Sequence, residues 1–223
     1  WEIAYACRDD YGGGLRDVSA WAGIHYFASR EHEESVPFTF PEGNGWILRR
    51  LLKTLEVRTR AMVHGIRREG TRWRVQFNNE AIVADAVVFA ASTFLTPYLI
   101  EGVAKVDWPY SPWLTANLTI ENAAELGETA WDNVIHRSKS LGYVVATHQS
   151  LASQHQRSVW TWYHALTGDP REQRRWLLAL NWRDAAELIL KDLEQAHPQI
   201  RQHVSRIDVM RWLPMNSTPR SST

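Results

Sequence analysis

The feature that most constrains the fold is a change in the spacing of apolar residues near residue 56. Residues 46–55 (WILRRLLKTL) repeat their apolar side chains at helical spacing. Beyond them the apolar residues recur at every second position: Trp73, Val75 and Phe77 alternate with polar residues. Asn78-Asn79 is a turn signal, and residues 81–84 supply the return strand of a hairpin. The chain therefore combines α and β structure.

The flanking segments support the same interpretation. Residues 19–30 have helical spacing, with Asp17 or Ser19 as the N-cap. Residues 86–91 (AVVFAA) are apolar on both faces, which is typical of a strand inside a sheet. The second half contains a long amphipathic region and several strand candidates: 170–196, then 114–120, 133–136, 142–148, 158–164 and 204–212. We expect a fold of the α+β or α/β class, with a mostly antiparallel second half.

Charge and cysteine content exclude several classes of protein. The 25 basic residues are balanced by 25 acidic ones and are spread over both halves, so no basic face exists for nucleic acid. A single cysteine rules out an internal disulfide and a Cys-rich metal site. No apolar run in these 223 residues approaches the roughly 20 residues that a bilayer requires, and we expect no secretory leader within them. We expect a soluble protein, cytoplasmic or periplasmic, without a metal.

The two ends predict a segment cut from a longer chain. The sequence starts with Trp1 rather than methionine, and a helix begins there without an N-cap residue. Residues 213–223 are rich in proline, serine and threonine, so we expect a disordered tail.

Two patterns resemble ligand-binding motifs but are better explained by ordinary structure. Gly12-Gly13-Gly14 follows two carboxylates, Asp9 and Asp10, that would repel phosphate, so a turn is favoured. His32-Glu33-Glu34 lacks the second histidine of a zinc-protease motif, because Val36 stands at that position. A solvated acidic loop explains it.

Two nucleophiles are also candidates. Ser150 is flanked by His148 and His155, but no G-x-S-x-G turn surrounds it. A serine hydrolase nevertheless stays open, since triads are assembled in space. Cys7 lies among apolar residues and is expected to be a packed thiol.

Tryptophan is unusually frequent, with 12 in 223 residues. Trp160 and Trp162 share one face of a strand, and core packing is the favoured explanation. The alternative is a ligand cavity that these two residues line together with Trp108 and Trp113.

The order of segments resembles the middle of the flavin-dependent amine-oxidase-like oxidoreductases. A loop, a helix, an extended segment, a hairpin and an apolar strand follow one another, and no single motif is diagnostic. The matching stretches are FTFPEGNGW (38–46), VHGI (63–66), WRVQF (73–77), ADAVVFAAS (84–92), SPWLTANLTI (111–120) and SLGYVVATHQS (140–150).

The resemblance implies FAD as the cofactor and assigns residues to it. Val63 inherits a backbone contact to the adenine, with Met62 and His64 beside it. Small residues at the end of the apolar strand let the cofactor approach the backbone; these are Ala90, Ala91 and Ser92. The substrate domain of the family stacks a mostly antiparallel sheet over the flavin, and the candidates for its cavity wall are Trp113, His148, Trp162 and Tyr163.

The same resemblance divides the chain into parts. Residues 1–37 become a helical part of the substrate domain, residues 38–107 a partial FAD-binding domain, and residues 108–212 the substrate domain proper. The remaining residues, 213–223, form the expected tail. The partners would be a small-molecule substrate and the flanking segments of the parent chain.

The sequence also departs from the family. It contains no G-x-G-x-x-G and no terminal glycine-rich motif, and the stretch 113–117 (WLTAN) lacks the lysine that many amine oxidases carry there. We therefore expect a fragment of an FAD-dependent oxidoreductase that transfers a hydride from a small organic substrate to flavin, with an amine as one candidate substrate. The alternatives are a non-enzymatic tryptophan-rich ligand-binding module and a serine hydrolase.

Overall fold

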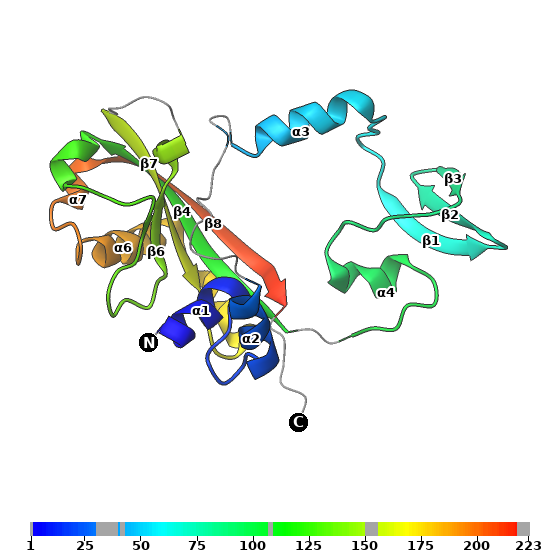
Figure 1. The fold of residues 1–223 in the computed structure, drawn as a ribbon, viewed down its shortest axis with the longest axis horizontal. Helices are drawn as coiled ribbons and strands as arrows, with labels where there is room; N and C mark the ends of the chain where they lie inside the picture. Colours follow the sequence, from blue (N-terminus) through cyan, green and yellow to red (C-terminus); the bar gives the residue numbers. More distant parts are fainter. Residues whose placement is uncertain (1, 30–39, 41–42, 107–108, 150–155, 218–223) are drawn as a thin grey trace. The chain divides into compact units, whose positions relative to one another are not determined.

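The computed structural model describes residues 2–29, 40, 43–106, 109–149 and 156–217 (Figure 1). For residues 2, 27, 148–149 and 214–217 it describes the backbone only. The chain divides into two compact units. Unit 1 consists of Trp1–Trp46 and Pro109–Thr223, and unit 2 of Ile47–Trp108. The mixture of helices and antiparallel sheets confirms the expected fold class.

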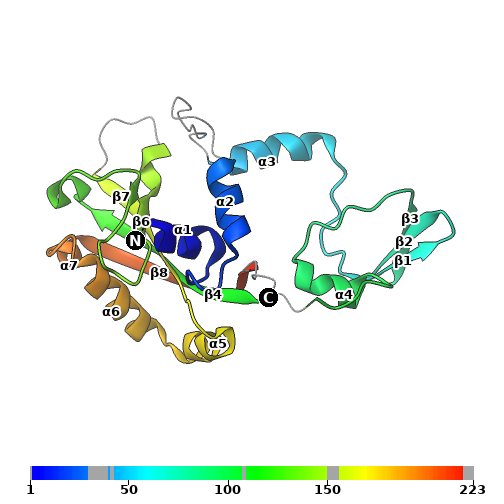
Figure 2. The ribbon, with the colours of Figure 1, turned by 60° about the horizontal axis from the view of Figure 1, so that its bottom comes forward.

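Unit 1 is built on a five-stranded antiparallel sheet in the order β5-β6-β7-β4-β8, so that β4 and β7 lie at its centre. Its strands are β4 (Tyr110–Glu121), β5 (Asp132–Asn133), β6 (Gly142–Val145), β7 (Arg157–Ala165) and β8 (Val204–Ser217). Figure 2 shows the long strands β4 and β8 side by side, with α5 (Pro170–Ala179) and α6 (Trp182–Leu193) along the sheet.

Strict alternation along β4 gives this sheet one buried face and one half-exposed face. Leu114, Ala116, Leu118 and Ile120 are completely buried, whereas the threonines and the asparagine between them keep part of their surface exposed. Successive side chains of a strand point to opposite faces, so these apolar residues share one side. Helices α5 (Pro170–Ala179), α6 (Trp182–Leu193) and α7 (Ile200–His203) pack against that side and complete the main core.

The long amphipathic region is two helices rather than one. Asp169 caps α5 by accepting the backbone N–H groups of Arg171 and Glu172, and Pro170 occupies the first turn. Asn181 then accepts the N–H of Asp184 and starts α6. Because Asn181 has extended backbone angles, it bends the chain between the two helices.

Unit 1 also contains α1 (Glu2–Tyr11) and α2 (Ala20–Ala28), which meet at a small core of Cys7, Val18 and Ala22. Ser19 caps α2, as its sequence predicts, by accepting the N–H of Ala22. Gly12 ends α1 with a φ of 63° and donates its N–H to the Arg8 carbonyl. The glycine run is therefore a helix-capping turn.

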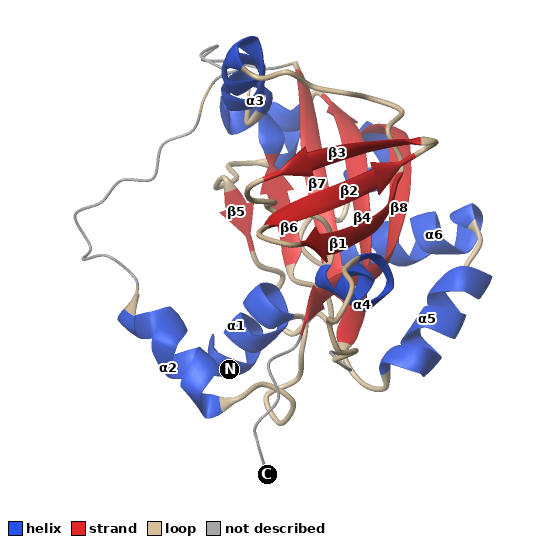
Figure 3. Ribbon diagram, turned by 90° about the vertical axis from the view of Figure 1, so that its right-hand side faces the viewer, coloured by secondary structure: helices blue, strands red, loops and turns tan. Residues whose placement is uncertain are grey.

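Unit 2 has α3 (Gly45–Leu51) at its border and a three-stranded antiparallel sheet, which faces the viewer in Figure 3. Its strands are β1 (Val63–Glu69), β2 (Arg72–Phe77) and β3 (Glu80–Ala84), followed by the short helix α4 (Thr96–Leu99). Asn78 adopts a φ of 49° in the turn between β2 and β3, as the turn signal predicts. The 3₁₀ turns of the two units are Leu52–Thr54, Thr93–Leu95, Ala123–Leu126 and Ala146–Gln149.

Two segments differ from the sequence-based expectations. Residues 86–91 form no strand among the described residues, and Val88 is 91% exposed. A strand that is apolar on both faces needs paired neighbours, and in the described part of the chain this segment has none. Residues 213–217, expected in a disordered tail, continue β8, because Ser217 pairs with Tyr110 and Asn216 with Ser111. None of the helices described here is long and apolar enough to cross a bilayer.

Gly142 offers a test of the sheet geometry. It has a φ of 98°, and a Cβ there would stand 1.9 Å from the Asn133 carbonyl oxygen on β5. Gly127 has a similar φ of 92° but open space around it. A side chain at Gly127 would therefore cause backbone strain without a steric clash, at a cost of about 1–3 kcal/mol.

We expect Gly142→Ala to lower the free energy of unfolding by about 4 kcal/mol and Gly127→Ala by clearly less. Urea denaturation followed by tryptophan fluorescence measures both. Equal losses in the two variants would contradict the close approach of β5 and β6.

Candidate functional site

The half-exposed side of the five-stranded sheet, called the open face below, is lined by polar side chains from three strands. Strand register places Thr161 of β7 beside Asn117 of β4, and Asp208 of β8 beyond it. Two residues further along these strands, Tyr163 of β7 lies opposite Thr115 of β4 on the same face. Thr161 donates its hydroxyl proton to Asn117 Oδ1 at 2.8 Å. Directly opposed residues of antiparallel strands share a face, so these groups form one surface.

An aromatic cluster closes one end of the open face. Trp113 packs with Tyr163 of β7 and with Tyr5, which α1 contributes. The Tyr163 hydroxyl donates to Asp132 Oδ1 at 3.1 Å, and the Tyr5 hydroxyl donates to the Leu141 carbonyl at 2.9 Å. Burial raises the pKa of Tyr5 to about 12 and raises the pKa of Tyr163 further. Both phenols are therefore neutral hydrogen-bond donors at physiological pH.

The indole of Trp113 is held against α1. The side chain is 5% exposed, and its buried Nε1 has no hydrogen-bond partner among the described residues. A Cβ on Gly12 would lie 3.0 Å from that nitrogen. The glycine that ends α1 thus also makes room for the tryptophan.

Trp162 does not belong to this surface. It lies next to Tyr163 in β7, so its side chain points to the helix-covered side, where it is completely buried. The structure therefore brings together Trp113 and Tyr163 of the expected cavity wall and separates Trp162 from them. Trp160 is also a core residue and stacks on Tyr143, with ring centroids 4.4 Å apart.

The remaining sequence candidates, apart from the expected cofactor residues, are of two kinds. Cys7 is buried among apolar residues, as expected of a packed thiol. His148 lies in the 3₁₀ turn Ala146–Gln149, but its side chain is outside the described part. Trp108, His32-Glu33-Glu34, Ser150 and His155 also lie outside the described residues. No group of three potential metal ligands occurs in the described portion of the chain.

The expected cofactor residues of unit 2 lie in two segments. Val63 begins β1, and a bulge there leaves His64 with no residue of β2 opposite it. The His64 ring is 3.0 Å from the Asn78 carbonyl, to which Nε2 donates. Ala90, Ala91 and Ser92 are exposed and lie in the irregular stretch before the turn Thr93–Leu95.

Sequence reasoning missed the most extensively hydrogen-bonded carboxylate of unit 1, Asp192 of α6. Its oxygens accept protons from four groups: Ser138 Oγ at 2.5 Å, Ser140 Oγ at 2.6 Å, Trp162 Nε1 at 2.8 Å and Gln195 Nε2 at 2.9 Å. The signal was available, because Asp192 interrupts the apolar face of α6 between Ile189 and Leu193. A charge at such a position requires buried donors.

His164 of β7 lies near this carboxylate, with its ring centroid 5.8 Å from that of Trp162. Burial lowers the pKa of His164 to about 4, which outweighs the opposing effect of Asp192. The imidazole is therefore neutral at physiological pH.

Replacement of Asp192 should destabilise unit 1. In Asp192→Asn one carboxylate oxygen becomes an NH₂ group, which cannot accept hydrogen bonds from the hydroxyl and indole donors that face it, so we expect a loss of about 3 kcal/mol in the free energy of unfolding. The matched control is Asp208→Asn, whose solvent-exposed pair with Arg206 is screened by water and should contribute little to stability. Urea denaturation measures both losses, and similar values for the two variants would contradict the role given to Asp192.

The lowered pKa of His164 predicts a dependence of stability on pH. Between about pH 6.5 and pH 4 the unfolded chain binds a proton at this position that the folded chain does not, so stability falls as the pH decreases. From pH 7 to pH 5 this contributes a loss of about 2 kcal/mol.

We expect His164→Gln to remove that component. Unfolding free energies at the two pH values measure it, and comparison with the unsubstituted chain cancels the contributions of other histidines. An unchanged pH dependence in the variant would refute the assignment to His164.

Comparison with known proteins finds several oxidases of similar fold. No protein-family model and no curated protein matches the sequence. The structure is similar to a protein assigned as a protoporphyrinogen oxidase from Exiguobacterium sp. 255-15 (17% identity, 98% of this chain and 48% of that one, TM-score 0.58). It is also similar to cyclohexylamine oxidase from Brevibacterium oxydans IH-35A (13%, 94% and 49%, TM-score 0.63) and to a putrescine oxidase variant with redesigned cofactor binding (12%, 82% and 41%, TM-score 0.59). The chain spans about half the length of these structures and shares its fold with that half of them.

Proposed function

We propose that this chain forms part of an FAD-dependent oxidoreductase whose substrate lies on the open face. The observation that carries the proposal is the asymmetry of the five-stranded sheet, which is packed by helices on one side and polar and half-exposed on the other. Its fold similarity to oxidases supports this assignment. In the resembling family, such a sheet stacks over the flavin ring.

The residues of unit 2 fit the adenine end of FAD. The bulge at His64 interrupts the ladder beside Val63, so backbone groups there are available to hydrogen-bond a base edge. Ala90, Ala91 and Ser92 are small and exposed, which permits a close approach of the cofactor to the backbone. When bound, FAD supplies the redox chemistry by accepting a hydride from the substrate.

The pyrophosphate of FAD has no corresponding site in the sequence. G-x-G-x-x-G is absent from all 223 residues, and this turn is where a helix N-terminus and its amides hold phosphate. Residues 1–223 by themselves therefore bind FAD weakly.

Residues of the open face would orient the substrate. Tyr163 presents a neutral phenol that donates to Asp132, and Thr161 and Asn117 form a hydrogen-bonded pair. Asp208 is neutralised by Arg206 at 2.8 Å. The surface thus suits a small polar organic molecule. Asp132 would attract a cationic group such as an amine, although the lysine typical of amine oxidases is missing from residues 113–117.

No structural observation favours the two alternative functions. A tryptophan-lined cavity would need Trp160 and Trp162 at a surface, and both are core residues on the side opposite Trp113. The serine hydrolase hypothesis depends on Ser150, which the structure does not describe.

The adenine contact predicts which ligands residues 1–223 recognise. In an ¹⁵N NMR titration we expect FAD and ADP to shift the amide resonances of residues 62–66 and 90–92, whereas FMN, which lacks adenine, leaves them in place. Shifts of equal size with FMN, or shifts confined to unit 1, would refute the assignment of these segments.

Two substitutions of Val63 test the backbone contact directly. Val63→Pro removes the N–H group at the first position of β1, where proline is tolerated in a strand. We expect it to abolish the ADP-induced shifts. Val63→Ala keeps the backbone groups and should retain them, whereas a similar loss in both variants would show that the side chain is recognised instead.

A further inference from the structure

The indole of Trp212 determines how a threonine of the open face can hydrogen-bond. Trp212 of β8 lies diagonally across from Thr115 of β4, and its Nε1 donates to Thr115 Oγ1 at 2.9 Å. A hydroxyl group has two lone pairs and one proton, so the indole occupies a lone pair and leaves the proton free to donate. That proton has no acceptor among the described residues. Thr115 is therefore a hydrogen-bond donor on the open face.

Asn117, two residues further along β4, is oriented in a similar way. Thr161 donates to its Oδ1, so the amide oxygen is turned toward β7. The NH₂ group of the same amide has no acceptor within the described part of the chain. Alternate residues of a strand share a face, and their Cα atoms are roughly 7 Å apart. The centre of the open face thus offers two neighbouring donors.

The carboxylates of the open face do not supply an acceptor for these donors. Asp132 Oδ1 accepts the phenolic proton of Tyr163 at 3.1 Å. Asp208 accepts hydrogen bonds from two nitrogens of the Arg206 guanidinium. An acceptor for the two donors of β4 must therefore come from a ligand or from solvent.

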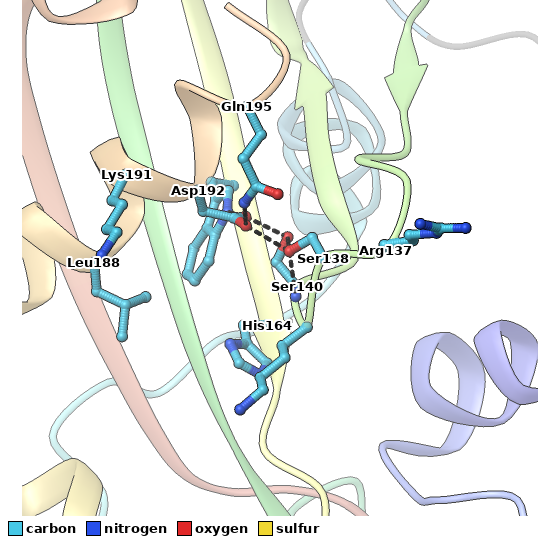
Figure 4. Close-up of a pocket in the computed structure, with 10 residues that line it drawn as sticks. Arg137, Ser138, Ser140, His164, Leu188, Lys191, Asp192 and Gln195 are labelled. Atoms are coloured by element: carbon cyan, nitrogen blue, oxygen red, sulfur yellow. Dashed lines mark hydrogen bonds between the residues drawn. The ribbon is translucent and has the colours of Figure 1, made fainter. Parts of the chain in front are cut away.

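The polar cluster on the helix-covered side is different, because it contains its own acceptor. A pocket of about 510 Å³ lies beside α6, and Asp192 lines it (Figure 4). Ser138, Ser140 and Gln195 all donate to that carboxylate, and Figure 4 shows the three side chains turned toward it. These donors are satisfied within the protein, whereas those of the open face are available to a ligand.

An aromatic surface lies beside the hydroxyl group of Thr115. The Trp212 side chain is 45% exposed, and its hydrogen bond to Thr115 holds the ring in one orientation. Met210 of β8 is half-buried and lies opposite Thr115 on the same face. Aromatic rings pack favourably against an indole, and methionine adapts its shape to such rings. One hydrogen bond thus keeps a donor and an apolar surface together.

We propose that the open face recognises an uncharged aromatic carbonyl compound, whose oxygen accepts the proton of Thr115 while its ring packs against Trp212. Asn117 supplies a second donor for a further acceptor atom of the ligand. An alkylammonium group carries only donors, so it would leave both Thr115 and Asn117 unsatisfied. The inference rests on the proposed function and names the substrate class for it, because the open face is the surface assigned there to the substrate.

The test is an ¹⁵N NMR titration of residues 1–223 with acetophenone, and in a second arm with 1-phenylethylamine, which carries an ammonium group in place of the carbonyl. We expect acetophenone to shift the indole N–H resonance of Trp212 saturably, and the amine to do so much more weakly. Trp212→Phe identifies this resonance by its loss.

Three variants of β4 test the role of the hydroxyl group. Thr115→Val keeps the shape of the side chain and removes the donor, so acetophenone should bind about fivefold more weakly, the loss of one neutral hydrogen bond. Thr115→Ser retains the hydroxyl group and should retain most of the affinity. The matched control is Thr119→Val, the same replacement on the same face of β4 but beyond Asn117. It should leave the affinity unchanged.

Three results would overturn the proposal. The first is an absence of saturable shifts of the Trp212 indole with acetophenone. The second is equal binding of the ketone and the amine, which would show that the open face does not select an acceptor. The third is an equal loss of affinity in Thr115→Val and Thr119→Val, which would indicate a general effect of the replacement.

These outcomes are separate from the test of the proposed function. Shifts by ADP at residues 62–66 and 90–92 without selection of acetophenone would refute the substrate class alone. Selection of acetophenone without shifts by ADP would instead refute the assignment of the adenine site and leave the preference of the open face standing.

Discussion

The alternation of side chains along β4 organises unit 1. Leu114, Ala116, Leu118 and Ile120 turn to one side, where burying them requires helices α5, α6 and α7. The residues between them turn to the other side and, with their partners on β7 and β8, remain available to solvent or to a ligand. A shift of one residue in register would exchange the two sides. The positions of Trp113, Asn117, Thr161 and Tyr163 therefore follow from that register.

The half-buried carboxylate of Asp192 is the main polar exception within the packed side. It joins three segments that are distant in sequence: helix α6, strand β7 through Trp162, and the segment 137–140 through two serines. Because a partly buried charge is stabilised by several donors, this network favours one mutual arrangement of the three segments. The same arrangement lowers the pKa of His164 by burial and forms the wall of the adjacent pocket.

Local structure could be predicted from the sequence where the pattern and the turn chemistry agree. The hairpin around Asn78, the helix capped by Ser19 and the strands β4 and β7 follow directly from periodicity. The break at Asn181 was missed because the apolar stripe continues across it. The assignment of Trp113, Trp162 and Tyr163 to one wall ignored the alternation of neighbours on β7. Asp192 was missed because its partners come from three separate segments, and spacing within one element cannot bring such groups together.

The exposed segment 86–91 affects how these molecules behave toward one another. It contains six apolar residues without charge or proline, and in the described chain its backbone has no ladder partner. Such a stretch is a template for pairing with an identical stretch of a second molecule. Self-association is a bimolecular process, whereas unfolding is unimolecular. Pairing through this segment would therefore depend on the concentration of the chain, whereas the unfolding of unit 1 does not.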